Sequence, residues 1–155
     1  MSKPLIISLI ALVAPFAVAA DTPDTVTPGQ WEMSMTFTSV TVGDQAMPVD
    51  TLNSRENSRN FCITPEEAKT PQQAFVKRSN TKKCKVNAAP PVPGILAYTL
   101  DCADDEAAGS LAFNGTYTAA SYQADMVADV AMSGTKVRMI GVMKGRHLGP
   151  KCAAE

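Results

Sequence analysis

An alternation of apolar and polar residues, repeated in one segment after another, most constrains the fold of this chain. Between Tyr122 and Met132 every second residue is apolar, while Asp125 and Asp129 occupy positions between them. A period of two residues is typical of a β-strand with one buried face. The same alternation recurs in the segments 31–37, 95–102, 111–117 and 137–143. The chain is therefore predicted to be mainly β.

Short polar turns separate these predicted strands. Pro28-Gly29 leads into the first strand, Gly43-Asp44 ends it, and Ser133-Gly134-Thr135 joins the last two. Strands spaced in this way indicate an antiparallel meander that forms a curved sheet or a small barrel. The more polar segment 51–61 is compatible with an edge strand or a loop.

Two helix-start signals follow the first cysteine. Thr64-Pro65-Glu66-Glu67 and Thr70-Pro71-Gln72-Gln73 each place threonine at the N-cap, proline at the first helical position, and Glu or Gln at the third. They predict one or two short helical turns between Thr64 and Lys77. The basic residues that follow, up to Lys85, are interpreted as a solvated loop.

The first twenty residues have the layout of a secretory signal peptide. Lys3 is followed by an apolar run from Leu5 to Val18, and Val18-Ala19-Ala20 offers small side chains for cleavage after Ala20. The apolar run is shorter than the roughly 20 residues that span a bilayer. We therefore expect an exported protein whose single domain covers residues 21–155, with no membrane span after signal cleavage.

All four cysteines lie in the predicted mature part: Cys62, Cys84, Cys102 and Cys152. An even number of cysteines in an exported protein favours two disulfides. Three pairings are possible, and Cys62 with Cys84 and Cys102 with Cys152 is preferred because sequence neighbours are usually close in an antiparallel sheet. Zinc is disfavoured, since the chain lacks a C-x-x-C pair and His147 lacks finger spacing.

The residue inventory disfavours catalysis and nucleic-acid binding. His147 is the single histidine, no catalytic motif accompanies it, and the thiols are expected to be oxidised. Asp104-Asp105-Glu106 is interpreted as solvated charge in a turn. The formal net charge of −1 offers no basic footprint for nucleic acid. We expect a non-enzymatic protein without a cofactor.

The concave face of the predicted sheet is the candidate ligand site. We expect it to be lined by Trp31, Met33, Phe37, Tyr98 and Phe113, and to bind a small apolar ligand or an envelope partner. Gly29-Gln30-Trp31 at the first strand, with Arg146 near the end, resembles the calycin arrangement, in which a barrel holds one small apolar ligand. Alternatively, Arg146 merely stacks on the tryptophan as a cation-π partner.

A Cu(I) carrier is the alternative interpretation. Met33 and Met35 fall on one strand face, and thioethers are soft ligands that suit Cu(I), with His147 as a further candidate ligand. Methionine on the inward face of a strand is, however, usually core. A third alternative is a purely structural envelope protein that binds neither ligand.

Several motifs, in order along the mature chain, resemble a bacterial exported family called domain of unknown function 3617. They are Pro28-Gly29-Gln30-Trp31-Glu32, Cys62-Ile63-Thr64-Pro65-Glu66-Glu67, then Cys84 and Cys102, and Gly145-Arg146-His147-Leu148-Gly149-Pro150-Lys151-Cys152. The resemblance implies export, to the periplasm, together with paired cysteines and a β domain, and it adds no catalytic residue. His147 stands where the family often has an aromatic residue. Arg146 and Gly149 match the ending motif, and we expect them to cap the tryptophan and to turn the chain toward Cys152.

Overall fold

The computed structural model describes residues 24–53, 57–79, 83–103 and 107–152. The predicted signal peptide and the acidic turn 104–106 lie outside the described residues. The elements in chain order are β1 (Gly29–Val42), β2 (Gln45–Met47), α1 (Asp50–Asn53), β3 (Ser58–Ile63), the 3₁₀ turn η1 (Glu67–Lys69), α2 (Pro71–Arg78), β4 (Cys84–Ala88), β5 (Ile95–Ala103), β6 (Ala107–Tyr117), β7 (Ser121–Met132) and β8 (Thr135–Gly149).

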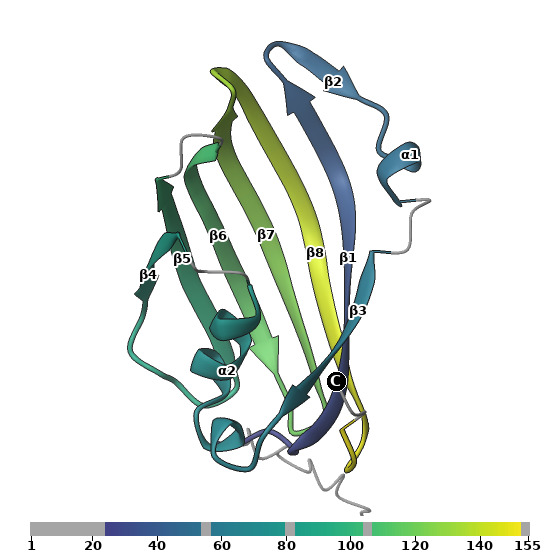
Figure 1. Ribbon diagram of the computed structural model, residues 1–155, viewed down its shortest axis with the longest axis vertical. Helices are drawn as coiled ribbons and strands as arrows, with labels where there is room; N and C mark the ends of the chain where they lie inside the picture. The colour runs from purple at the N-terminus through teal and green to yellow at the C-terminus, as the bar shows by residue number, and fades with distance from the viewer. Residues whose placement is uncertain (1–23, 54–56, 80–82, 104–106, 153–155) are drawn as a thin grey trace, which may run out of the picture.

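The strands form one antiparallel sheet that curves without closing into a barrel (Figure 1). Its strand order is β2-β1-β8-β7-β6-β5-β4, and β3 pairs separately with β1. Each strand from β4 to β7 pairs with the next one along the chain, and β8 returns to pair with β1. The prediction of a mainly β antiparallel meander is confirmed. Of the two predicted forms, a curved sheet and a small barrel, the structure has the curved sheet.

The concave face of the sheet carries the core. Its buried side chains come from the predicted inward positions of the strands and include Trp31, Leu96, Tyr98, Leu100, Phe113, Tyr122, Ala124, Met126 and Met143. Helix α2, with its eight residues, packs on one end of this face. Its Phe75 ring lies 4.4 Å from the ring of Tyr122 and 5.8 Å from that of Trp31, measured between ring centroids.

Only one of the two predicted capping boxes forms. The Thr64 hydroxyl accepts a hydrogen bond from the Glu67 amide (3.2 Å), and the Thr64 amide donates to the Glu67 carboxylate (3.1 Å). At Thr70, the N-cap of α2, no side-chain cap bond is made. The Gln72 side chain is instead buried and donates to the carbonyls of Ala89 and Ala97. This glutamine ties α2 to β5 and to the segment before it.

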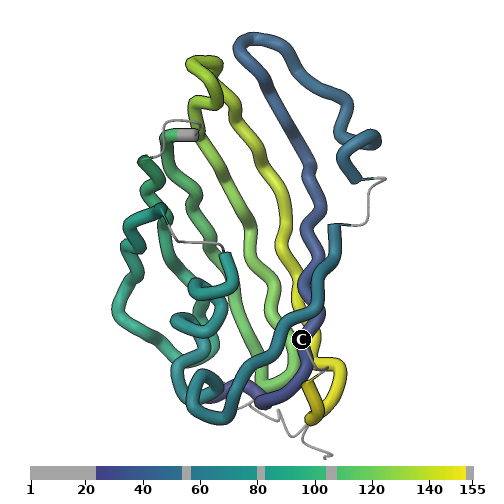
Figure 2. Tube along the Cα trace, viewed as in Figure 1, coloured from purple at the N-terminus to yellow at the C-terminus, as the bar shows by residue number. Residues whose placement is uncertain are grey.

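Helix α2 is too short to cover the concave face. Its eight residues extend about 12 Å at the α-helical rise, whereas the 15 residues of β8 extend about 50 Å. In Figures 1 and 2 the helical segment lies over one end of the sheet, and the middle of the concave face has no element in front of it. The described helices include none with the length and apolar character to cross a bilayer.

Two disulfides form, as predicted, but the preferred pairing was wrong. The bonds join Cys84 to Cys102 and Cys62 to Cys152. The first pair lies directly opposite in the register of β4 and β5. The second follows from the return of β8 to β1, because Gln30 has Cys62 beside it on one side and Gly149 on the other. Two disulfides indicate an oxidising, exported environment.

The outer edge of β1 is shared by three partners. β3 pairs with its first part, Gly29 to Ser34, and β2 with its end, Val40 to Val42. Between them, the side-chain amide of Asn53 in α1 makes the two backbone hydrogen bonds that a neighbouring strand would otherwise make. Its oxygen accepts from the Phe37 amide (2.9 Å), and its nitrogen donates to the Phe37 carbonyl (2.8 Å).

Candidate ligand-binding pocket

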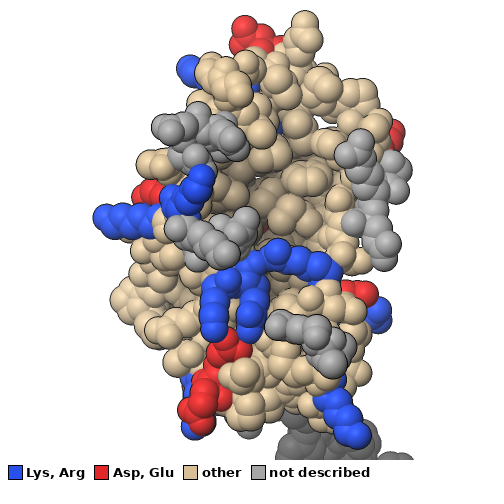
Figure 3. All heavy atoms as spheres, viewed as in Figure 1, with Lys and Arg blue, Asp and Glu red and all other residues tan. Residues whose placement is uncertain are grey.

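The uncovered part of the concave face contains an apolar pocket of about 380 Å³. Four neighbouring strands, β1, β8, β7 and β6, form its floor, and β3 and the residue after α2 form its rim. We call it the methionine pocket, after the five methionines among the residues that line it: Met33, Met35, Phe37, Asn57, Ser58, Arg59, Ser79, Leu111, Phe113, Met126, Met139 and Met143. The space-filling view shows a hollow on this face (Figure 3).

The apolar lining has a buried base and a more accessible wall. Phe113, Met126 and Met143 are almost fully buried, at 4%, 2% and 2% exposure. The side chains with intermediate exposure are Met35, Phe37, Leu111 and Met139. These four apolar side chains contact the core on one side and remain within reach of a ligand on the other. The pocket therefore offers apolar surface that the fold itself leaves incompletely covered.

The outer face of the sheet offers a different kind of hollow. A depression of about 420 Å³ there is lined mainly by polar and charged side chains, among them Glu32, Gln123, Lys144 and Arg146. It lacks the apolar lining that buries most of a small ligand in typical binding sites. We therefore place the candidate site in the methionine pocket.

Three of the predicted ligand-binding residues, Met33, Phe37 and Phe113, line this pocket, and two neighbouring aromatic residues do not. Trp31 has 0% exposure, since α2 covers it, and its indole N–H donates to the Thr27 carbonyl (2.9 Å). Tyr98 is buried and stacks on Phe113 with ring centroids 4.7 Å apart. Tyr98 thus supports the pocket from outside it, and Trp31 belongs to the core under α2.

The expectation that Arg146 packs against Trp31 was wrong. Arg146 is the register partner of Glu32, whose side chain points away from the core, and the two form an ion pair of 2.7 Å on the outer face. His147 lies opposite Trp31 instead, with ring centroids 5.7 Å apart. The arginine was misplaced because adjacent strand residues point to opposite faces.

Of the candidate copper ligands, the structure brings together the two methionines but not the histidine. Met33 and Met35 both line the methionine pocket. His147 is held elsewhere, with its Nε2 atom 3.1 Å from the Pro28 carbonyl oxygen. Among the described residues, no group of three or more His, Cys, Asp or Glu side chains could hold a metal ion.

The rim of the pocket contains residues that the sequence did not single out. Arg59 comes from β3 and Ser79 from the end of α2, so both depend on how these elements cross the sheet. The alternation of apolar and polar residues along the strands predicted that the other methionines of the floor face inward: Met126, Met139 and Met143. No local sequence signal marks the rim.

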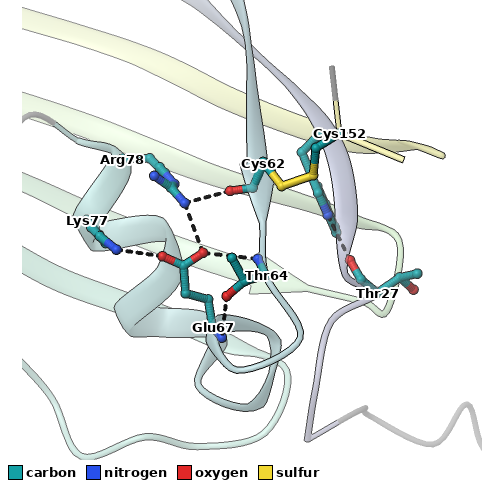
Figure 4. A network of polar contacts seen from close by, with 8 residues as sticks. Thr27, Cys62, Thr64, Glu67, Lys77, Arg78 and Cys152 are labelled. Atoms are coloured by element: carbon teal, nitrogen blue, oxygen red, sulfur yellow. Dashed lines mark hydrogen bonds and ion pairs between the residues drawn. A yellow bond between two sulfur atoms is a disulfide. The ribbon is translucent and has the colours of Figure 1, made fainter. Parts of the chain in front are cut away.

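A charged network fixes α2 beside this rim (Figure 4). The Glu67 carboxylate lies 2.7 Å from the Lys77 ammonium and 2.9 Å from the Arg78 guanidinium, which also donates to the Cys62 carbonyl (2.6 Å). Burial raises the pKa of Glu67, but the hydrogen bonds from Lys77 and Thr64 and the nearby charges outweigh it, so this pKa lies below its ordinary value. The network holds the end of the helix against β3.

A hydroxyl pair at the pocket stays protonated at neutral pH. Burial raises the pKa of Tyr98 to about 12, although the hydrogen bond to Ser79 and the charge of Arg59 act in the opposite direction. The two hydroxyl oxygens are 2.8 Å apart, and the Ser79 hydroxyl also lies 3.3 Å from the Phe75 carbonyl. Because a carbonyl only accepts, Ser79 donates to Phe75 and Tyr98 donates to Ser79.

Comparison with known proteins identifies a family but no individual similar protein. The model of the family described as "Protein of unknown function (DUF3617)" matches residues 26–152. No curated protein and no solved structure matches the chain. Since the match spans β1 to the last cysteine and covers most of the sequence, the chain belongs to the DUF3617 family.

Proposed function

We propose that this protein is a periplasmic, non-enzymatic binding protein that holds a small apolar molecule, or the apolar part of a larger one, in the methionine pocket. The observation that supports this proposal is the lining itself. Eight apolar side chains from four strands converge on one cavity, and four of them remain partly exposed. A volume of about 380 Å³ falls within the roughly 300–1,000 Å³ of small-molecule sites.

The chemistry of the lining suits an adaptable apolar site. Methionine side chains are unbranched and polarisable, so they adjust to ligands of different shape. A ligand that buries about ten methylene groups gains about 8 kcal/mol from the hydrophobic effect. Association costs at least about 4 kcal/mol, so this apolar contact alone leaves at most about 4 kcal/mol, which corresponds to a dissociation constant of about 1 mM.

The cysteines and the histidine, which are frequent catalytic residues, have structural roles in this protein. The cysteines form disulfides, and the single histidine of the sequence packs on Trp31 and lies near the Pro28 carbonyl. This arrangement supports binding rather than chemistry as the role of the protein.

The first test is binding of the fluorescent probe N-phenyl-1-naphthylamine. The wild-type protein should enhance its emission, and Leu111→Trp, which fills the pocket, should weaken probe binding at least tenfold. Leu148→Trp is the matched control, because Leu148 lies on the surface with 45% exposure. Equal probe binding by the two variants, or none by the wild type, would refute the proposal. Native mass spectrometry of protein purified from a periplasm would then identify a co-purified ligand.

A Cu(I) carrier is the second candidate, and the convergence of five methionines on one cavity favours it. The site would consist of thioethers alone, since His147 lies elsewhere. Titration with Cu(I) in competition with bicinchoninate tests it. Under this alternative, Met35→Leu and Met139→Leu should each weaken copper binding while leaving probe binding intact. A purely structural envelope protein would bind neither the probe nor copper.

A further inference from the structure

We infer that the methionine pocket selects amphiphiles with an aliphatic chain and an anionic head group, and that Arg59 is the residue that recognises the head. This inference rests on the proposed function, which supplies the apolar site. It adds the charge of the ligand and the position of that charge at the rim.

Arg59 lies where a head group would emerge from the pocket. In the antiparallel register of β1 and β3 it is the partner of Met33, and register partners point to the same face of a sheet. Arg59 is therefore directed toward the concave side, where it lines the pocket. Its guanidinium donates to the Arg78 carbonyl at the end of α2, so the side chain bridges from β3 to the helix.

The guanidinium retains capacity for a ligand. It has five N–H donors, and a single carbonyl is its hydrogen-bond partner among the described residues. No described carboxylate forms an ion pair with it, whereas the neighbouring Lys77 and Arg78 both pair with Glu67. A carboxylate or phosphate could engage the remaining donors of Arg59 in a two-pronged hydrogen bond.

The surroundings of Arg59 carry excess positive charge. Among the described residues, the rim and the adjacent end of α2 contain three cations, Arg59, Lys77 and Arg78, and their carboxylate partner is Glu67. In Figure 3 a basic band crosses the face beside the apolar hollow. Such a field attracts an anion and disfavours a cationic ligand. This argues against a cationic head group and, equally, against a metal ion in the pocket.

The hydroxyl pair of Ser79, at the rim, and Tyr98, beside it, is less able to bind the head group. The hydroxyl protons of Tyr98 and Ser79 are already donated within the protein, in the chain that runs from Tyr98 to Ser79 to the Phe75 carbonyl. That leaves the Arg59 guanidinium as the charged donor at the rim. An apolar floor with one cationic group at its edge matches the two ends of a fatty acid or an alkyl phosphate.

Displacement of N-phenyl-1-naphthylamine by three ligands with the same chain tests the inference: dodecanoate, dodecanol and dodecyltrimethylammonium. At pH 8 and below micelle formation, dodecanoate should displace the probe from wild-type protein at a concentration about tenfold lower than dodecanol, as expected for a charge-assisted hydrogen bond. Dodecyltrimethylammonium should be the weakest. This comparison needs no variant and is independent of any folding defect.

Arg59→Gln should remove the preference for dodecanoate and leave displacement by dodecanol within about twofold of wild type. Arg138→Gln, the matched control on the outer face, removes the same charge from the Asp129 ion pair and should leave the preference intact. Equal displacement by all three ligands, or an equal loss in both variants, would overturn the inference while probe binding upheld the proposed function. If instead the wild type did not bind the probe, or if Leu111→Trp bound it as well as Leu148→Trp, the proposed function would be refuted.

Discussion

The two disulfides should contribute unequally to stability, because they close loops of very different length. Cys62 and Cys152 are 90 residues apart in sequence, and Cys84 and Cys102 are 18 apart. The loop-entropy relation gives about 4.6 kcal/mol for the longer loop and about 3.2 kcal/mol for the shorter one. Compared with the roughly 5–15 kcal/mol stability of a typical domain, either loss is large.

Replacement of each pair by alanines tests this difference. Urea unfolding can be followed by the fluorescence of Trp31, the single tryptophan of the sequence, which is fully buried in the folded protein. With an m-value of about 1.5 kcal/mol/M, the variant without Cys62–Cys152 should unfold at a urea concentration about 1 M lower than the variant without Cys84–Cys102. Non-reducing peptide mapping of the wild type verifies the pairing.

An equal or reversed order of the two midpoints would refute the reasoning. It would mean that strain or residual structure, rather than loop closure in the unfolded chain, determines what each bond contributes. Unfolding slopes that differ between the variants would point to the unfolded state in particular, since the slope follows the surface exposed on unfolding.

Three further predictions concern individual contacts. Gly145→Ala should destabilise the protein by about 2 kcal/mol or more in urea unfolding, because its methyl group would lie 2.0 Å from an aromatic ring, whereas Gly149→Ala, with open space around the added carbon, should be nearly neutral. Asn53→Ala should cost about 1–3 kcal/mol through two lost hydrogen bonds to β1, and Asn53→Asp should recover the bond to the amide alone. Glu67→Gln should destabilise by about 1 kcal/mol at pH 7. Since the folded pKa of Glu67 lies below the ordinary 4.5, this difference should persist above about pH 5 and vanish as the pH falls through the lowered folded pKa; a constant difference down to pH 2 would contradict the assignment.

The strands and their inward faces were predictable because the signal is local. A period of two residues assigns Met33, Phe37, Phe113 and Met126 to one side without any knowledge of the neighbouring strands. The length and polarity of the intervening turns then suffice for the meander. This is why most of the pocket floor could be anticipated from the sequence.

The disulfide pairing and the rim depend on contacts between distant segments. The return of β8 to β1 places Cys152 beside Cys62, and no local pattern in either segment encodes that return. Likewise, the position of α2 over Trp31, which removes this residue from the accessible site, follows from packing of the whole sheet. The same crossing brings Arg59 to the pocket, although its own segment was compatible with an edge strand or a loop.

The division of the β1 edge among β3, Asn53 and β2 has a consequence for self-association. A free edge strand is a template on which a second molecule can add its own strand and begin to aggregate. Here the backbone hydrogen-bonding groups of Phe37, in the middle of the stretch 35–39 between the two partner strands, are satisfied by an asparagine side chain. The β1 edge is thus closed to strand addition by another polypeptide, while the concave apolar face beside it stays accessible to small molecules.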